Sequence, residues 1–348
     1  MVKIALLGAA GQIGTPLSLL CKTSDLLDEI ALYDIVHVPG IATDLMHIDT
    51  KAKVIGYLPQ DDGLKKALTG ADIIVVTAGI ARKPGMTRDD LFKVRQQPHN
   101  KTKDPNAVPS LEQPSLTNTQ TNAHIIRAIF TEVAATCPKA ICCIVTNPVN
   151  STVPVAAETL KRAGVFDPTR LFGVTTLDVV RASTFAAHAT NTDPKAYKVP
   201  VIGGHSGATI LPLYSQAQPP VNLDEEALAA VIKRVQFGGD EIVKSKQGAG
   251  SATTCMAYAG FRFVKAILAA MAGETVTEEA YVYLPGIPGG DEIAARLGVD
   301  YFAVKVEIGK MGASKALPFG EISESERKLL GIAIEGLKKD IATGLALK

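Results

Sequence analysis

The sequence predicts an α/β protein with a doubly wound parallel sheet in its N-terminal half and a mixed α+β domain in its C-terminal half. Short apolar runs alternate with helical patterns through the first 150 residues, and a glycine-rich turn joins the first run to the first helical pattern. Long helical patterns dominate the rest of the chain. Strands that alternate with helices favour right-handed βαβ units and therefore a parallel sheet.

The expected strands of the first half are short. The runs at 71–77 and 140–146 are largely apolar, which is typical of strands buried on both faces. Five strands are expected in this half, at residues 2–7, 29–33, 53–57, 71–77 and 140–146. The helical patterns between them cover residues 13–21, 39–47 and 63–68.

The second half has longer helical patterns and fewer β-rich runs. The helical patterns cover residues 152–162, 177–190, 223–244, 252–272 and 324–347. The β-rich runs cover residues 197–202, 279–284 and 301–308. A chain of 348 residues is long enough for two domains. The change of pattern near Asn150 places them at 1–150 and 151–348.

The composition excludes several classes of protein. With 47% hydrophobic and 20% charged residues, the chain has an ordinary globular balance rather than that of a disordered, collagen-like or coiled-coil protein. The net charge of +1 gives no overall field to attract nucleic acid or an anionic membrane. No apolar run approaches the roughly 20 residues of a membrane span. An anionic ligand must therefore be bound by local cations.

The chain ends and the cysteines predict a cytoplasmic protein, without excluding an organellar one. The first residues already read as a strand, so none remain for a cleavable presequence. The last residues do not form the Ser-Lys-Leu peroxisomal address. Five cysteines without Cys-x-x-Cys spacing indicate reduced thiols. We expect no metal site.

A glycine loop, G-A-A-G-Q-I-G at residues 8–14, separates the first expected strand from the first expected helix. Gly8, Gly11 and Gly14 let the backbone turn tightly and approach a pyrophosphate, while the helix start supplies N–H donors. The alternative is that the glycines serve only the turn, since this spacing alone is a weak signal.

Asp34 strengthens the first interpretation of the loop. It lies 20 residues after Gly14, at the end of the second expected strand. An acid at this place hydrogen-bonds the adenine ribose hydroxyls and repels a 2′-phosphate. A solvated carboxylate at a strand end is the alternative. Together the loop and the acid predict a Rossmann domain that binds NAD rather than NADP.

Among six histidines, only His205 follows an apolar strand and lies among glycines, where a ligand can reach it. Its candidate partner is Asp178, because a carboxylate on Nδ1 fixes the tautomer and stabilises the imidazolium. Arg181 lies three residues after Asp178 and shares its helix face, where it could bind a substrate carboxylate. The alternatives are a structural histidine and a surface ion pair.

A basic stretch, R-K-P-G-M-T-R at residues 82–88, follows the expected strand at 71–77. A loop after a parallel strand lies over the ligand crevice of such a sheet. Solvated surface charge is the alternative for this stretch.

These segments together resemble the malate dehydrogenases of the lactate/malate dehydrogenase family, in the branch shared by mitochondrial, peroxisomal and many bacterial enzymes. The resemblance covers nearly all of the chain except 94–120. It rests on the segments 8–14, 77–79, 81–91, 121–123, 145–150, 177–181 and 203–207, together with Asp34. It implies an NAD-dependent enzyme that interconverts malate and oxaloacetate, and a homodimer.

The resemblance also implies a role for each site residue. His205 would exchange the proton of the malate hydroxyl, with Asp178 as its partner. Arg181 would hold the carboxylate beside the reacting carbon, Arg82 the distal carboxylate, and Arg88 would polarise the carbonyl. The implied cofactor contacts are Gly8, Gly11, Gln12, Ile13, Gly14, Asp34, Asn122, Val145, Asn147 and Met256, of which Asn147 would also bind substrate.

Two other functions stay open at this point. A lactate dehydrogenase-like enzyme for 2-hydroxy acids would need an uncharged residue in place of Arg82. A non-catalytic NAD-binding sensor would keep the glycine loop and Asp34, but it would not need His205, Asp178 and three arginines.

Residues 94–120 fit neither half of the chain, because they contain four prolines and no periodic apolar face. The sequence predicts that they are a translated, unspliced intron. Val94 requires a GT-initial codon, Gln120 is compatible with CAG, and Thr117-Asn118 is compatible with a branch-point sequence. Without the insert, Lys93 joins Thr121 and one amphipathic helical pattern runs through Leu91, Phe92, Ala123, Ile126, Phe130 and Val133. A genuine functional loop is the alternative.

Sequencing of the mature transcript tests the intron prediction. We expect the dominant mRNA to lack the 81 nucleotides that encode residues 94–120, and the resulting 321-residue form to be more active and more stable than the 348-residue chain. A dominant mRNA that retains all of these nucleotides would contradict the prediction.

Overall fold

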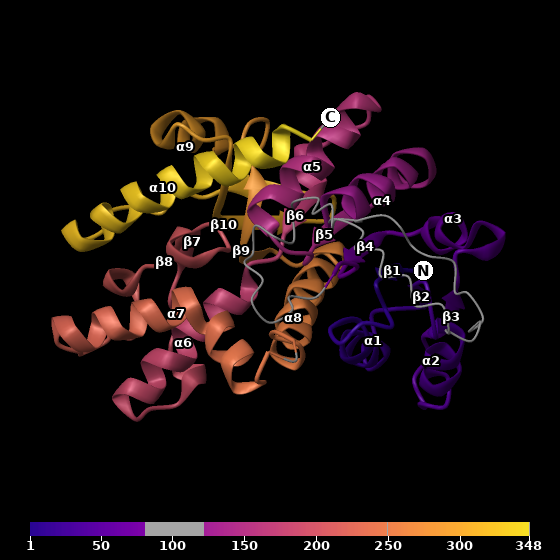
Figure 1. Cartoon of the computed structure of the whole chain (residues 1–348), viewed down its shortest axis with the longest axis horizontal. Coiled ribbons are helices and arrows are strands. Elements are labelled where there is room, and N and C mark those ends of the chain that lie inside the picture. The colour runs from indigo at the N-terminus through magenta and orange to yellow at the C-terminus, as the bar shows by residue number, and fades with distance from the viewer. Residues whose placement is uncertain (81–121, 249, 348) are drawn as a thin grey trace, which may run out of the picture.

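A computed structural model describes residues 1–80, 122–248 and 250–347 (Figure 1). One mixed sheet runs through the molecule, and its strands follow the order β3-β2-β1-β4-β5-β6-β9-β10-β7-β8, with β11 paired to β10. The first six strands in this order are parallel. They are β1 (Lys3–Leu7), β2 (Glu29–Tyr33), β3 (Lys53–Tyr57), β4 (Ile73–Val76), β5 (Ile141–Ile144) and β6 (Leu171–Gly173).

The parallel strands confirm the predicted fold class. Their order, 3-2-1-4-5-6, is that of doubly wound dinucleotide-binding sheets, in which the direction of winding reverses between β1 and β4. Ligands of such sheets bind outside the carboxyl ends of the strands at this reversal. The parallel part extends to β6, beyond the change of sequence pattern near Asn150. The position of the domain boundary stays a prediction.

The rest of the sheet is antiparallel and belongs to the second half of the chain. It consists of β7 (Val201–Gly203), β8 (Ile210–Pro212), β9 (Val276–Tyr283), β10 (Tyr301–Gly309) and β11 (Gly312–Ala316). The register joins the two parts through one pair, Gly173 opposite Tyr281. Strands β6, β8 and β11 were not expected from the sequence. The first two have only three residues each, too few to show an alternating pattern.

The expected helices are present with ends shifted by a few residues. They are α1 (Gly14–Lys22), α2 (Val38–Leu45), α3 (Gly63–Leu68), α5 (Val149–Arg162), α6 (Thr176–Thr190), α7 (Glu225–Ser245), α8 (Thr254–Met271) and α10 (Glu324–Leu345). Helix α9 (Gly290–Leu297) was not expected. Helix α4 (Asn122–Thr136) buries Ala123, Ile126, Phe130 and Val133, the predicted positions that lie within the described residues.

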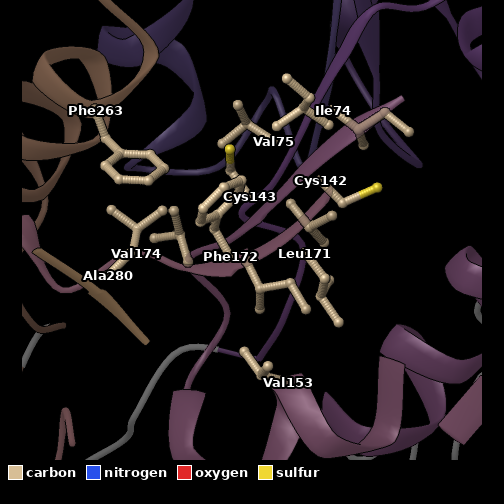
Figure 2. Packing of buried hydrophobic residues seen from close by; sticks show 14 of the residues in the cluster. Ile74, Val75, Cys142, Cys143, Val153, Leu171, Phe172, Val174, Phe263 and Ala280 are labelled. Atoms are coloured by element: carbon tan, nitrogen blue, oxygen red, sulfur yellow. The ribbon is translucent and has the colours of Figure 1, made fainter. Parts of the chain in front are cut away.

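Helix α8 packs in the core where the two halves of the chain meet. It is the one helix of the described residues that is long and apolar enough to cross a membrane, and over half of its length is buried inside the fold. The Phe263 ring of α8 meets the Phe172 ring of β6 edge-on, with 5.5 Å between centroids (Figure 2). Burial against the sheet therefore accounts for the apolar composition of α8.

Two predicted features fall outside the described residues: the insert 94–120, and the basic loop with Arg82 and Arg88.

The cysteines generate a prediction about thiol reactivity. All five are free thiols, and only Cys255 is partly exposed. Burial raises the pKa of Cys137 to about 11 and raises the pKa values of Cys21, Cys142 and Cys143 further. Thiolates react and thiols do not, so we expect one fast-reacting thiol per native chain with Ellman's reagent at pH 8. All five should react in denaturant.

Cys255→Ser is the control for this experiment. The native variant should show no fast phase, and a remaining fast phase would contradict the packing described for the other four cysteines.

Candidate active site

A cavity of about 370 Å³ lies beyond the carboxyl ends of β1, β4 and β5, where α6, α7 and α8 approach the sheet. Many of the predicted site residues line it. They are Gly11, Gln12, Ile13, Gly14, Asn122, Val145, Asn147, Arg181, His205 and Met256. The tertiary structure thus brings the glycine loop and the candidate catalytic residues into one cavity, from positions as far apart as residues 11 and 256.

The glycine loop is required for the turn and also faces the cavity. Gly8 has a φ of +91°, and a Cβ atom there would lie 2.4 Å from the Ala78 nitrogen. A Cβ atom at Gly14 would lie 2.1 Å from the Gly8 oxygen. Gly8 is not among the cavity-lining residues, whereas Gly11 is. Gly8 therefore serves the turn alone, whereas Gly14 is required by the close packing of the loop and also lines the cavity.

The start of α1 fits an anionic group. Helix α1 begins at Gly14, and its N-cap residue, Ile13, makes no side-chain capping hydrogen bond. Residues 11–14 line the cavity at this point. Backbone N–H groups and the positive end of the helix dipole therefore face the cavity, as a pyrophosphate requires. The loop and the cavity fit a dinucleotide cofactor.

Asp34 lies beside the glycine loop and is not part of the cavity lining. Its Oδ2 accepts a hydrogen bond from the Ala10 nitrogen (2.9 Å), and its Oδ1 accepts one from the Ile35 nitrogen (2.7 Å). Each carboxylate oxygen can accept a further hydrogen bond. The carboxylate is therefore held in place at the end of β2 and keeps acceptor capacity for a ribose.

His205 and Asp178 form the predicted pair. The His205 Nδ1 lies 2.5 Å from Asp178 Oδ2, and the Asp178 side chain is completely buried. A carboxylate only accepts, so Nδ1 carries the hydrogen and donates it. Nε2 is then the nitrogen that can take up a proton. The end of β7 supplies the histidine and the first turn of α6 supplies the aspartate.

Arg181 shares the buried face of α6 with Asp178, as the spacing predicted. Its Nη1 lies 3.7 Å from Asp178 Oδ1, and its side chain is 8% exposed. Among the described residues, Arg181 Nη2 and Asn147 Oδ1 are buried polar atoms without a hydrogen-bond partner. Such atoms are rare in folded proteins. Both residues line the cavity, so the arrangement indicates a polar ligand that pairs with the guanidinium.

Asn122 joins the loops after β4 and β5 at the cavity edge. Its Oδ1 accepts a hydrogen bond from the Ile80 nitrogen (2.6 Å), and its Nδ2 donates to the Asn147 oxygen (2.8 Å). Asn122 therefore holds the backbone of Asn147 in position. In the parts of the chain that the structure describes, no group of three or more His, Cys, Asp or Glu residues is placed to hold a metal ion.

Sequence reasoning missed the contribution of α7. Gly239 and Val243 line the cavity, and a Cβ atom at Gly238 would lie 3.1 Å from Arg181 Nε. Gly238 thus leaves room for the guanidinium. Two adjacent glycines inside a helical pattern were the available signal, because glycine destabilises a helix and needs a packing reason there. The loop 251–253 also lines the cavity and was not predicted.

Family models match almost the whole chain. The model of the lactate/malate dehydrogenase NAD binding domain matches residues 2–100 and 116–173. The model of the alpha/beta C-terminal domain of the same family matches residues 175–348. The chain belongs to the lactate/malate dehydrogenase family. Its NAD binding domain confirms the cofactor predicted from the glycine loop and Asp34.

Named relatives agree with this family. The mitochondrial malate dehydrogenase of Schizosaccharomyces pombe is 47% identical over 343 residues, which cover 98% of this chain and 90% of the relative. The human mitochondrial malate dehydrogenase is 45% identical over the same shares of both chains. The crystal structure of Cryptosporidium parvum malate dehydrogenase superposes with a TM-score of 0.78, at 25% identity and over 99% of both chains.

The relatives contradict the expectation of a cytoplasmic protein, which was wrong. The fission yeast, human and cat relatives are all mitochondrial enzymes by name. The expectation rested on the chain ends and on reduced thiols. Folding and packing of the core do not depend on an address signal. Buried thiols can stay reduced because oxidants do not reach them, and not only because the compartment is reducing. Neither feature therefore identifies a compartment.

Two predictions about the family pattern remain untested. The NAD binding domain model leaves residues 101–115 unmatched, and these lie within the predicted insert 94–120. Arg82 and Arg88 lie outside the described residues, so their roles stay predictions.

The position of Asp34 generates a prediction about cofactor choice. Asp34→Ser should weaken NADH binding and relax the rejection of NADPH, because the acceptor for the ribose and the charge that repels a 2′-phosphate are lost together. NADH and NADPH titrations followed by cofactor fluorescence measure both effects, and the absence of tryptophan keeps the background low. Equal use of both cofactors by the unmodified chain would contradict the role given to Asp34.

Proposed function

We propose that the chain is an NAD-dependent malate dehydrogenase (EC 1.1.1.37) that interconverts (S)-malate and oxaloacetate. One observation carries the proposal: the His205–Asp178 pair and Arg181 line or border the same cavity as the glycine loop, and the buried Arg181 Nη2 has no hydrogen-bond partner among the described residues. A proton-transfer group and a carboxylate-binding group beside a dinucleotide cradle are what oxidation of a 2-hydroxy acid requires.

Each residue would contribute one part of the reaction. NAD, when bound, accepts or donates the hydride. His205 Nε2 takes the hydroxyl proton of malate, and Asp178 stabilises the imidazolium that forms. The Arg181 guanidinium binds the carboxylate next to the reacting carbon through its planar fork. Asn147 orients the hydroxyl or carbonyl oxygen of the substrate and borders the cofactor.

The cofactor would lie along the residues at the sheet side of the cavity. Gly11, Gln12, Ile13 and Gly14 would hold the pyrophosphate, and Asp34 would accept from the ribose. Asn122, Val145 and Met256 would border the NAD. These assignments follow from the family resemblance, and the cavity lining supports all of them except that of Asp34, which lies beside the glycine loop.

Arg82 and Arg88 complete the proposed specificity. A dicarboxylate needs a second cation for its distal carboxylate, and the basic loop at residues 82–88 supplies it. A lactate dehydrogenase-like enzyme would lack this cation. A sensor that binds NAD without catalysis would not need the buried His205–Asp178–Arg181 arrangement, so we rank both below malate dehydrogenase.

We propose further that the enzyme is a mitochondrial homodimer of the tricarboxylic acid cycle. The names of the relatives support the compartment. Exposed apolar side chains on two helices that pack together support the dimer: Leu19 of α1 is 46% exposed and Tyr258 of α8 is 56% exposed. Light scattering during gel filtration measures the oligomeric state.

Substrate comparison tests the proposed function. With NADH, we expect fast reduction of oxaloacetate and slow reduction of pyruvate and 2-oxoglutarate. Arg82→Gln should lower the oxaloacetate/pyruvate ratio of kcat/KM by about 10²-fold or more, because the distal carboxylate then lacks a partner in a dry site. An unchanged ratio would refute the role of Arg82.

His205→Asn is the matched control for catalysis. It should bind NADH normally while turnover falls by about 10²-fold or more, since the proton acceptor is lost. Wild-type-like turnover in this variant would favour another catalytic residue, and no turnover in the unmodified chain with any 2-oxo acid would favour the sensor.

A further inference from the structure

The buried Asn150 side chain lies directly beneath the backbone of His205. Its Oδ1 accepts a hydrogen bond from the His205 nitrogen (2.8 Å). Its Nδ2 donates to Asp340 Oδ2 (2.8 Å) and to Thr209 Oγ1 (3.1 Å). A backbone N–H can only donate and a carboxylate can only accept, so these two partners fix the orientation of the amide.

The residues that follow β7 and lead to His205 pack closely against the Asn150 side chain. A Cβ atom at Gly204 would lie 2.7 Å from Asn150 Oδ1 and 2.8 Å from its Nδ2. The same Cβ atom would lie 2.6 Å from Thr209 Oγ1. Only a glycine allows this approach, so the contact between Asn150 and the His205 backbone is part of the local packing.

Helix α10 holds Asn150 from the other side. Ser151 Oγ donates to the Asp340 backbone oxygen (2.8 Å). A Cβ atom at Gly344 would lie 2.5 Å from the Ser151 oxygen, and one at Gly336 would lie 2.9 Å from Thr209 Cγ2. Figure 1 shows α10 running beside α5, the helix that carries Asn150. The C-terminal helix is therefore packed against the segment that supports His205.

We propose that Asn150 is a positioning residue for His205, and that Asp340 of α10 holds Asn150 in place. Asp178 holds the imidazole through Nδ1, and Asn150 holds the backbone of the same residue. With both ends of His205 held, Nε2 has a defined position in the cavity. The effect expected on kcat rests on the proposed function, whereas the effect expected on hydrogen exchange of the His205 backbone does not.

Asp340 is the better site for the first test, because it is only partly buried and its loss leaves Asn150 Nδ2 bonded to Thr209. Asp340→Ala removes the acceptor, and Asp340→Asn keeps one in the side-chain amide oxygen. Hydrogen–deuterium exchange of the segment 201–209 without substrate should be faster in Asp340→Ala and unchanged in Asp340→Asn.

The kinetics should show the same difference between the two variants. For oxaloacetate reduction, Asp340→Ala should lower kcat by about three- to tenfold and change KM by less than about twofold, because a displaced proton-transfer group slows the chemical step more than binding. Asp340→Asn should stay within about twofold of the unmodified chain.

A charge exchange provides the second test. Asn150→Asp places two carboxylates together and should lower kcat by about tenfold or more. In the double variant Asn150→Asp/Asp340→Asn, the carboxylate at position 150 accepts from the His205 nitrogen. The amide at position 340 then donates to that carboxylate, so each hydrogen bond has a donor and an acceptor. This variant should recover to within about threefold of the unmodified chain.

Three results would overturn the proposal. They are equal exchange at 201–209 in Asp340→Ala and the unmodified chain, equal loss of kcat in Asp340→Ala and Asp340→Asn, and a folded double variant without recovery. If oxaloacetate is not reduced by the unmodified chain, the proposed function fails by itself. The exchange experiment then still decides whether Asp340 and Asn150 hold the His205 backbone.

Discussion

The completely buried carboxylate of Asp178 is the constraint on which the site depends. A buried charge is tolerated only with partners close by, and here the partners are His205 at 2.5 Å and Arg181 at 3.7 Å. The start of α6 and the end of β7 must therefore meet, and α7 must leave space at Gly238 for the guanidinium. One buried group thus relates the positions of three segments.

The continuous sheet determines which groups can meet at the cavity. Its parallel part opens the carboxyl ends of β1, β4 and β5 toward the glycine loop and the start of α1. Its antiparallel part continues through the single pair of Gly173 and Tyr281 and presents His205 at the end of β7. Because one sheet carries both parts, the glycine loop and the His205–Asp178 pair share one support.

Local rather than overall electrostatics must attract the substrate, since the chain has a net charge of only +1. A buried guanidinium interacts more strongly with a carboxylate than a surface cation does. The helix start at Gly14 offers N–H donors that suit an anionic group. Uncharged side-chain amides hold the backbone of the loops: Asn122 donates to the Asn147 oxygen, and Asn150 accepts from the His205 nitrogen.

The sequence by itself determined the doubly wound class, the strands β1 to β5, the cofactor loop and the His205–Asp178–Arg181 set. These features depend on short-range patterns, namely alternation of strands with helices, glycine spacing and helical i,i+3 spacing, which are visible without coordinates. Family resemblance added roles for residues such as Asn147 and Met256. Arg82 and Arg88 remain predictions of the same kind, because they lie outside the described residues.

Only the tertiary structure decided that β6 extends the parallel sheet, that α7 contributes Gly239 and Val243 to the cavity, and that Asp340 of α10 supports Asn150 beneath His205. Strand β6 has three residues and shows no period, and Asn150 and Asp340 lie 190 residues apart. Contacts of this kind depend on how helices pack across the sheet. Local sequence patterns do not encode that packing, because the same amphipathic helix can dock on more than one neighbour.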